Sequence, residues 1–395
     1  MSQKILSINS GSSSIKFKFY QMPEEEVLAS GSIDRIGGKN SEFSFSAHAE
    51  KSKIVKDIPD HSSAIQEVIE MLLTSGIIHN KSEIDGVGHR ISHGGSYTKS
   101  VLIDQKVEDR IDELSVLSPL HNPVNLIGIK AFKKLLPDAK EVAVFDTSFH
   151  HTMPEKAYLY ALPYEYYEKH GIRRYGFHGP SHQYIAERSV ELFGKEQTSR
   201  LISCHLGNGS SLCAIKDGES INTSMGFTPL AGLVMGTRSG DIDPEILPFI
   251  EEEFDMNSHD VREMLNKKSG LLGISGISND MRDLEEAASK GNKRAQLALD
   301  VFVHQIQHYI GAYATDLNGI DMIVFTAGIG QYSPTIRAMV CSQLGYLGVK
   351  VDEEKNKTNA LSIEADDSKV KIAVIPTDEE IIIARDVMEV AGFSD

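Results

Sequence analysis

Three stretches of the sequence join an apolar run to small residues in the way that phosphate binding requires. Residues 9–14 read Asn-Ser-Gly-Ser-Ser-Ser, residues 205–211 read His-Leu-Gly-Asn-Gly-Ser-Ser, and residues 326–330 read Thr-Ala-Gly-Ile-Gly. Glycine and serine leave backbone N–H groups uncovered and add hydroxyl donors, and both kinds of group hold phosphate oxygens. A plain hairpin turn is the alternative for residues 9–14, because tight turns favour the same residue types for local reasons.

The second stretch repeats the first at about half the chain length. The serine pair at 210–211 corresponds to the pair at 13–14, an offset of 197 residues in a chain of 395. Such a repeat indicates duplicated domains whose equivalent loops face each other across a cleft. We therefore predict one domain at 1–150 and a second at 151–395, with a C-terminal helix at about 380–395 as a candidate addition to the first.

None of the three stretches matches the P-loop pattern or the GxGxxG dinucleotide pattern, so the sequence indicates neither of those folds. Asn9 stands at the end of the first apolar run, where its side-chain oxygen is well placed to meet a metal ion. We therefore expect a nucleotide, with a metal ion beside its phosphates, where these strands end.

Isolated charges mark further candidate residues. The formal net charge of −16 argues against nonspecific binding of nucleic acid, so a protein of this charge that handles anions must gather its cations locally. Arg90 and Arg238 lie beside glycines, and their guanidinium groups suit carboxylate and phosphate oxygens. Asp146 follows an apolar run at 141–145, and an acid at the carboxyl end of a strand is a candidate for chemistry. Capping of the next turn is the alternative.

Composition bounds the class of protein. The 395 residues, 41% of them hydrophobic, are enough for two domains with proper cores. No segment approaches the roughly 18 uninterrupted apolar residues of a membrane span, and Asn9 and Ser10 interrupt the first apolar run before it resembles a signal peptide. The three cysteines have no zinc or disulfide spacing. We therefore expect a cytoplasmic protein with no membrane partner.

Hydrophobic periodicity and capping residues predict the elements that must position these side chains. Strands are expected as short pieces within 27–58, within 84–95 as a strand that runs into a glycine-rich end, and at 141–145, 322–326 and 372–375. Helices are expected at 61–78, 106–117, 124–136, 180–193, 243–267 and 291–316, with further helix starts near 280, 333 and 378. Residues 152–175 are expected to be irregular, and residues 326–330 to be a glycine loop.

Two histidine pairs have the i, i+4 spacing of helical metal ligands. A Gly-Pro pair, which favours a turn, separates His178 from His182. His304 and His308 lie on a predicted helix, where histidines are more often surface or core residues than ligands. We therefore expect neither pair to bind a metal.

Eight motifs in order resemble the acetate kinase (acetokinase) family over essentially the whole chain. They lie at 9–17, 88–90, 119–123, 145–150, 175–179, 205–209, 235–241 and 326–330. The resemblance implies an α/β fold of two duplicated actin-like ATPase (ribonuclease H-like) domains, as in the sugar kinase superfamily, with an interdomain active-site cleft. It also implies a homodimer.

The resemblance implies a phosphotransferase with a carboxyl group as acceptor. The reaction is reversible Mg²⁺-dependent phosphoryl transfer between ATP and acetate, which gives acetyl phosphate and ADP by direct in-line transfer, with Mn²⁺ as an alternative ion. Phosphoryl transfer needs positioning and positive charge more than covalent chemistry, and the isolated arginines agree with that need.

The resemblance also implies residue roles. Arg90 matches the arginine that binds the substrate carboxylate, and Arg238 and His178 match residues that stabilise the transition state. His121 matches an active-site histidine, and Asp146 matches the residue described as catalytic. The implied metal-binding residues are Asn9 and Glu379. The implied nucleotide-binding residues are Lys16, Ser12, Ser14, His205, Leu206, Gly207, Asn208, Gly209, Asp280, Met281, Arg282, Gly328, Ile329, Gly330, Gln331 and Tyr332.

Asp146 has two alternative roles. A carboxylic acid substrate with a pKa near ~4.3 is already ionised at neutral pH, so the nucleophile has no proton for a general base to remove. We therefore expect Asp146 to orient magnesium-bound water or an active-site arginine, with a general base as the alternative.

The chain departs from the family pattern at two places. Gln331-Tyr332 stands where Glu-Asn is common, which predicts a different nucleotide pocket. The substrate methyl pocket is matched by Leu120, Phe177 and Pro229, but Ser92 stands where valine is usual. Serine is smaller and polar, so the sequence predicts that propionate is also accepted, and a propionate or broader short-chain carboxylate kinase is the alternative function.

Other classes of protein explain less of the sequence. A heat-shock-type or other non-metabolic actin-like ATPase would share the phosphate hairpins but would not need Arg90 beside an apolar pocket. A purely structural protein would leave the glycine loops and isolated arginines unexplained.

Overall fold

The computed structural model describes residues 2–48, 50–119 and 121–393. The chain divides into two compact units: one holds Met1–Phe149 with Asp378–Asp395, and the other holds His150–Thr377. The described residues form helices and strands in both units, so the predicted α/β class is confirmed. The functional division at 150/151 stays a prediction. Among the residues that the structure describes, no helix has the length and apolarity to span a bilayer.

The first unit is built on an eight-stranded sheet with the order β5-β4-β3-β2-β1-β6-β8-β7. Its strands are β1 (Gln3–Ser10), β2 (Ser14–Met22), β3 (Glu26–Asp34), β4 (Ser41–Ala47), β5 (Glu50–Lys56), β6 (Gly86–Ile91), β7 (Val101–Leu102) and β8 (Lys140–Phe145). Its helices are α1 (His61–Thr74), α2 (Gln105–Glu113), α3 (Asn122–Leu135) and α16 (Glu379–Val390), with 3₁₀ turns at Lys81–Glu83 and Leu114–Val116. A third 3₁₀ turn, Ser148–Thr152, ends the N-terminal segment.

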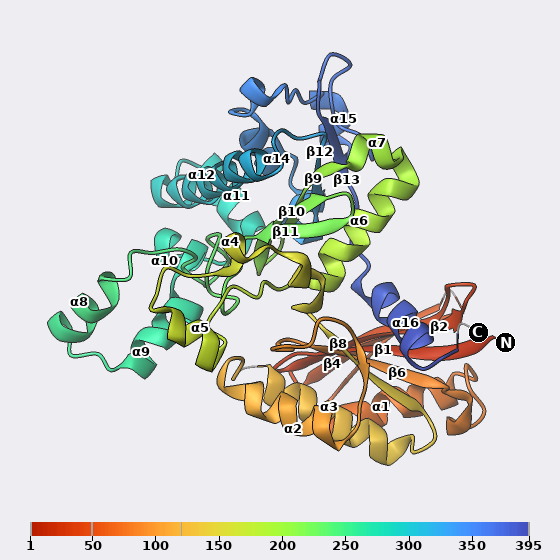
Figure 1. Cartoon of the computed structure of the whole chain (residues 1–395). Coiled ribbons are helices and arrows are strands. Elements are labelled where there is room, and N and C mark those ends of the chain that lie inside the picture. The colour runs from red at the N-terminus through yellow and green to blue at the C-terminus, as the bar shows by residue number, and fades with distance from the viewer. Residues whose placement is uncertain (1, 49, 120, 394–395) are drawn as a thin grey trace. The chain divides into compact units, whose positions relative to one another are not determined.

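Period-two alternation of side chains gives this sheet two buried faces. Leu6 and Ile8 of β1 join one core cluster with Phe132 of α3 and with apolar residues of α1. Ser7 points to the other face, where its hydroxyl donates to the Glu380 carbonyl of α16 at 2.7 Å. Figure 1 shows α16, in blue, lying along β1 and β6, with α1 and α3 on the opposite side of the sheet.

Glycines on β6 let α16 approach the sheet closely. A Cβ atom at Gly86 would lie 2.6 Å from Val387, and one at Gly88 would lie 2.8 Å from the same valine and nearer still to Ile383. These apolar side chains of α16 therefore occupy the space that larger residues on β6 would need. The close packing fixes the first turn of α16, which carries Glu379, against the sheet.

The second unit repeats the central sheet of the first. Its strands are β9 (Arg200–Leu206), β10 (Ser210–Lys216), β11 (Glu219–Thr223), β12 (Met322–Thr326) and β13 (Lys371–Val374), in the order β11-β10-β9-β12-β13. The five strands β3-β2-β1-β6-β8 of the first unit have the same order and the same sequence of antiparallel and parallel pairs. The predicted duplication is confirmed, and the two phosphate-type loops, 11–13 and 207–209, connect equivalent hairpin strands.

Helices cover both faces of the second sheet. Its helices are α4 (Glu155–Tyr158), α5 (Tyr164–His170), α6 (Gly179–Phe193), α7 (Lys195–Thr198), α8 (Ile246–Glu253), α9 (Ser258–Glu263), α10 (Gly270–Ser275), α11 (Met281–Ser289), α12 (Lys293–Asp316), α13 (Ala327–Tyr332), α14 (Pro334–Cys341) and α15 (Glu353–Lys357). A π-helical turn lies at Met264–Lys268 and a 3₁₀ turn at Gly345–Leu347. Helix α12 packs its apolar stripe on Ile202, Cys204 and Leu206 of β9, whereas α6 packs on the face that carries Ser203.

Three predicted elements were wrong. The helix expected at 243–267 is broken into α8, α9 and a π-turn: α8 ends at Glu253, and the Asn257 side chain caps the start of a new helix, α9. The irregular segment 152–175 contains two short helices, α4 and α5, which follow Pro154 and Pro163.

The glycine loop expected at 326–330 was the third wrong prediction, because these residues form a strand-to-helix junction. Ala327 turns the chain in the left-handed region at φ 61°, and α13 continues through both glycines to Tyr332. The other predicted helices and strands are confirmed to within a few residues at their ends.

Candidate active site

A partly buried ion-pair cluster forms the centre of the candidate site in the first unit. Arg90 of β6 donates from Nε and Nη2 to the two carboxylate oxygens of Asp146, at 2.7 and 2.8 Å. Its Nη1 lies 2.7 Å from a carboxylate oxygen of Glu379 at the start of α16. The neighbouring parallel strands β6 and β8 bring Arg90 and Asp146 to one edge of the sheet.

The residues of this cluster shift one another's pKa values. The pKa of Glu379 is raised to about 7, mainly because burial disfavours its charged form; the positive charge of Arg90 opposes this increase, and the negative charges of Asp146 and Glu380 add to it. Burial opposes the charge of Arg90, but the carboxylates of Asp146 and Glu379 outweigh it and raise the pKa of the guanidinium. Two carboxylates therefore share one arginine, and a bound cation would relieve their repulsion.

The remaining predicted residues of the first unit lie on or near the hairpin. Asn9 and Lys16 face each other in the register of β1 and β2, Ser12 lies in the turn between those strands, and Ser14 is the first residue of β2. His121 precedes the first turn of α3. Leu120 lies outside the described residues.

Asn125 is a site residue that sequence reasoning missed. From α3 its amide donates to the Ser10 carbonyl at 2.9 Å and accepts from the Ser92 backbone N–H at 3.2 Å. It therefore holds the end of β1 to the segment that carries Ser92. A buried polar residue on an amphipathic helix was the available signal.

In the second unit, His178 and Arg238 converge on the phosphate-type loop. A Cβ atom at Gly209 would lie 3.5 Å from Nε2 of His178 and 3.7 Å from Nη1 of Arg238. Burial lowers the pKa of Arg238, whose Nη1 also donates to the Pro229 carbonyl at 3.2 Å. The arrangement presents two nitrogen groups beside a loop that has no side chain in the way.

His178 is held in an uncommon backbone conformation. It precedes α6 in the left-handed region at φ 56°, and its ring stacks on the ring of His205 with 4.1 Å between centroids. The predicted neighbour Phe177 is buried with Met225 and Met235. Left-handed backbone at a non-glycine residue is strained and often marks a functional position.

The glycine-rich segment that carries Arg238 contacts the phosphate-type loop 207–209. The Gly236 N–H donates to the Asn208 carbonyl at 3.0 Å, and a Cβ atom at Gly236 would collide with the Asn208 side chain. The Asn208 side chain accepts from Asn279 at 3.0 Å. Loop 207–209, the segment that carries Arg238 and the start of α11 are therefore in contact.

The predicted nucleotide residues fall into two groups in this unit. Asp280 caps α11 and binds the guanidinium of Arg282, whose side chain is 88% exposed, while Met281 is buried. The residues from Gly328 to Tyr332 form most of α13, and Tyr332 is 69% exposed.

Arg337 is a second residue whose role in the candidate site could not be predicted from the sequence. Its buried Nη1 donates to the carbonyls of Gly330 and Gln331 at 2.8 and 2.9 Å. The bonds satisfy carbonyl groups at the end of α13 that the short helix leaves open. Arg337 therefore fixes the segment that contains the predicted nucleotide-binding residues 328–332.

The chemistry of the predicted metal residues fits Mg²⁺. Asn9 and Glu379 offer an amide oxygen and a carboxylate, and Mg²⁺ keeps most of its ligands as water and phosphate oxygens. The structure records no contact between these two side chains, and the described residues contain no group of three or more His, Cys, Asp and Glu side chains arranged to hold a metal.

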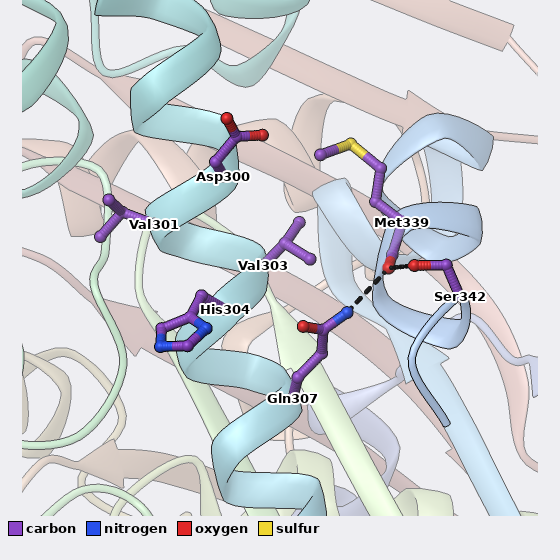
Figure 2. A pocket seen from close by; sticks show the side chains of 7 residues that line it. All are labelled: Asp300, Val301, Val303, His304, Gln307, Met339 and Ser342. Carbon is purple, nitrogen blue, oxygen red and sulfur yellow. Dashed lines mark hydrogen bonds between the residues drawn. The ribbon is translucent and has the colours of Figure 1, made fainter. Parts of the chain in front are cut away.

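A separate pocket of about 450 Å³ lies between α12 and α14 (Figure 2). It is lined by Asp300, Val301, Val303, His304, Gln307, Met339 and Ser342. Figure 2 shows Gln307 and Ser342 both donating to the Met339 carbonyl, at 2.9 and 2.7 Å. None of the predicted site residues lines this pocket.

The duplicated sheets carry Arg90 and Asp146 at one strand edge and His178 and Arg238 beside loop 207–209, an arrangement of the α/β class that suits the binding and transfer of a phosphoryl group. Comparison with known proteins makes the assignment specific: the family model described as the acetokinase family matches residues 4–385. The chain belongs to the acetokinase family.

Full-length relatives agree with this assignment. The chain is 54% identical to the acetate kinase of Geobacillus kaustophilus (strain HTA426), over 98% of this chain and 99% of that one. Its sequence is 43% identical to that of the protein in the crystal structure of Porphyromonas gingivalis acetate kinase. The match covers 98% of this chain and 100% of that one, with a TM-score of 0.91. A propionate kinase structure from Francisella tularensis subsp. tularensis SCHU S4 is 40% identical, with a TM-score of 0.92 and coverage of 97% and 98%.

Proposed function

We propose that the chain is an acetate kinase, which transfers a phosphoryl group reversibly between ATP and acetate to give ADP and acetyl phosphate. The observation that carries the proposal is 54% identity to an acetate kinase over 98% of the chain. The Arg90 cluster supports it, because the reaction needs a cation for a carboxylate that is about to receive a phosphoryl group.

Arg90 binds the acetate carboxylate in this proposal. A guanidinium has five N–H donors, of which Asp146 takes two, while Nη1 forms an ion pair with Glu379. Within the described chain Arg90 therefore keeps N–H donors that could meet an incoming carboxylate or phosphoryl oxygen. Asp146 holds the guanidinium by two bonds, so its proposed role is to orient Arg90 rather than to remove a proton.

His178 and Arg238 stabilise the transferring phosphoryl group. Both side chains reach loop 207–209 with nitrogen groups, and Gly209 leaves room for phosphate oxygens. Charge on the equatorial oxygens grows in the transition state, so a donor and a cation placed there lower the barrier. His121 is proposed as a further contact in the first unit.

Asn9 and Glu379 would hold Mg²⁺, or Mn²⁺ in its place. The ion would neutralise the phosphate charges of ATP and remove the repulsion between Glu379 and Asp146. ATP would bind loop 205–209, Asp280–Arg282 and α13, with Lys16, Ser12 and Ser14 as further contacts. Gln331 and Tyr332 define where this nucleotide pocket differs from the usual family pattern.

A propionate kinase is the second candidate function. The Francisella tularensis neighbour described as a propionate kinase is 40% identical to this chain, and Ser92 is smaller than the valine usual in the family. We expect acetate to be preferred and propionate to be accepted, because one methylene is worth only about 1–3 kcal/mol in such a pocket.

A hydroxamate assay for acyl phosphate, with acetate, propionate and butyrate as acceptors, tests both candidates. Acyl phosphate formation that depends on ATP and Mg²⁺ and is fastest with acetate supports the proposal. ATP hydrolysis that is independent of a carboxylate would instead indicate an ATPase of another class. Replacing ATP by other nucleoside triphosphates tests the nucleotide assignment.

The proposed enzyme works in the cytoplasm as a homodimer. Light scattering on purified protein tests the oligomeric state, and a mass near twice 43.5 kDa is expected. Fractionation of cells that express the chain tests its location.

A further inference from the structure

A chain of hydrogen bonds runs from the interior of the second unit to His178. The Ser203 hydroxyl on β9 lies 2.9 Å from Nδ1 of His182 on α6. Nε2 of His182 lies 2.8 Å from the Ser211 hydroxyl on β10, which lies 2.9 Å from Nδ1 of His178. Ser203, His182 and Ser211 are fully buried, so water does not substitute for a missing partner.

The inner end of the chain fixes its direction. Among the described residues, Nδ1 of His182 is the one hydrogen-bond partner of the Ser203 hydroxyl. If Nδ1 carried the ring proton, the hydroxyl hydrogen of Ser203 would be buried without an acceptor. An unsatisfied buried donor costs about 1–3 kcal/mol, so Ser203 donates to Nδ1 and the ring proton of His182 lies on Nε2.

The direction continues outward through Ser211. His182 is neutral and has a single ring proton, because burial and the neighbouring His150 and His205 hold its pKa well below the usual value. Its Nε2–H donates to the Ser211 oxygen. The Ser211 hydrogen then points to Nδ1 of His178, since the Ser211 hydroxyl has no third side-chain or carbonyl partner in the described chain.

We propose that Ser203, His182 and Ser211 are positioning residues, which keep the proton of the neutral His178 ring on Nε2. His178 then faces Gly209 as a hydrogen-bond donor, beside Nη1 of Arg238. A donor at this place suits a phosphoryl oxygen, whereas an unprotonated nitrogen would repel it. The catalytic consequence rests on the proposed function, but the location of the proton does not.

The proton can be located by long-range ¹H–¹⁵N correlation NMR of histidine side chains. Spectra are recorded at about pH 8, where an ordinary imidazole is neutral, and His178→Gln assigns the His178 signals. We expect an unprotonated Nδ1 and a protonated Nε2 for His178 in the unaltered protein. A protonated Nδ1 would overturn the proposal.

Ser211→Ala removes the link between His182 and His178 and leaves the Ser203–His182 hydrogen bond in place. We expect the His178 ring to become a mixture of both tautomers. Loss of about one hydrogen bond should lower kcat roughly tenfold, with KM for ATP within about twofold. Ser211→Thr restores the hydroxyl and should restore the single tautomer.

Ser189→Ala is the matched control. Ser189 is a fully buried serine on the same helix as His182, and its hydroxyl has no partner in the described chain. This variant should change neither the His178 spectrum nor kcat. A Ser211→Ala protein that keeps the single Nε2–H tautomer would overturn the proposal even if kcat fell.

The His178 tautomer and kcat test two different things: the position of the proton and its role in catalysis. If Ser211→Ala mixes the tautomers and kcat does not change, the proton assignment stands and the catalytic role of His178 is wrong. If the unaltered protein forms no acyl phosphate, the proposed function fails, and the NMR result still decides the hydrogen-bond chain.

Discussion

At the scale of single residues, the two hydrogen bonds from Arg90 to Asp146 favour an orienting role for Asp146 over that of a general base. Asp146→Asn removes one member of a buried charge pair, which typically costs about 2–5 kcal/mol, so kcat/KM for acetate should fall at least ~30-fold. The acidic limb of the pH–rate profile should remain. It should move only to lower pH, because the Asp146 charge is one of the causes that raise the pKa of Glu379.

Asp146→Glu serves as the control, since it keeps the charge and displaces it by one methylene. Kinetics at saturating ATP and Mg²⁺ across the pH range measure both effects. Complete loss of the acidic limb in Asp146→Asn would indicate a general base instead.

Glu379 makes the stability of the metal-free protein depend on pH. Its pKa is raised from 4.5 to about 7, so the folded chain binds this proton more tightly than the unfolded chain does. The contribution to the free energy of unfolding is therefore full below pH 4.5 and is lost as the pH rises through about 7.

Glu379→Gln cannot ionise and should abolish this loss. In the presence of a chelator, its Tm relative to the unaltered protein should be higher at pH 8 than at pH 5. Glu389→Gln, an exposed acid on the same helix, should show no such difference. An equal Tm difference at both pH values would contradict the shift.

Ser92 provides a prediction about substrate choice. The unaltered protein should use propionate with a kcat/KM above one hundredth of that for acetate, because a methylene is worth only about 1–3 kcal/mol. Ser92→Val should lower the propionate-to-acetate ratio by about tenfold. The Ser92 contact with Asn125 uses the backbone N–H, so valine preserves it. The control is Ser96→Val at an exposed position nearby.

Residue types at strand ends predicted part of the candidate site, and their hydrogen-bond partners could not be predicted. Arg90 and Asp146 were recognisable because charge at the end of an apolar strand is uncommon. Asn125, Ser211 and Arg337 were not, since their importance depends on which segments the fold brings together. Single-sequence patterns describe what surrounds a residue along the chain and not what lies across a sheet.

At the scale of elements, Asp378 connects the phosphate hairpin to the helix that carries Glu379. Its carboxylate caps α16 by accepting from the Ile381 N–H at 3.1 Å. It also accepts from Lys18 at 2.7 Å and from the Tyr20 hydroxyl at 3.2 Å, both on β2. One side chain therefore fixes the first turn of α16 relative to the sheet.

Asp378→Ala should raise the Mg²⁺ concentration needed for half-maximal rate and lower the free energy of unfolding by about 0.5–2 kcal/mol, because the helix loses its cap. Asp378→Asn keeps a capping oxygen and loses the charge, so its effect on stability should be smaller. Magnesium titrations and chemical denaturation measure the two quantities. If Asp378→Ala left the Mg²⁺ dependence unchanged, the helix cap would have no effect on metal binding.

The wrong element predictions have physical causes. The periodic pattern at 243–267 predicted one helix although Asn257 lies within it. The Asn257 side chain accepts from two backbone N–H groups and so starts a new helix. The glycines at 328 and 330 were interpreted as a loop, but Arg337 stabilises the end of a short helix there. In both cases a specific hydrogen bond outweighed an average preference.

At the scale of the whole molecule, the first unit depends on both ends of the chain. Deletion of Asp378–Asp395 removes α16 and exposes the glycine face of β6 together with apolar side chains that α16 covers. We expect the first unit to lose its cooperative unfolding and become sensitive to protease. A fragment that contains His150–Thr377 should resist longer, because its contacts lie within one continuous segment.

Mass spectrometry of timed digests identifies the surviving fragment. Deletion of residues 392–395 is the control, because it leaves α16 intact through Val390. Equal protection of both units in the longer deletion would show that α16 is dispensable for the first unit.

The position of α16 at the end of the chain also bears on synthesis. The segment that is translated first contains β1 and β6, but the helix that covers them is translated last. Domains generally fold as they emerge from the ribosome, so the first unit must wait, incomplete, while His150–Thr377 is made. Glu379, the proposed metal-binding residue, arrives with the final segment, so we expect a chain whose translation stops before it to be inactive however much of it has folded.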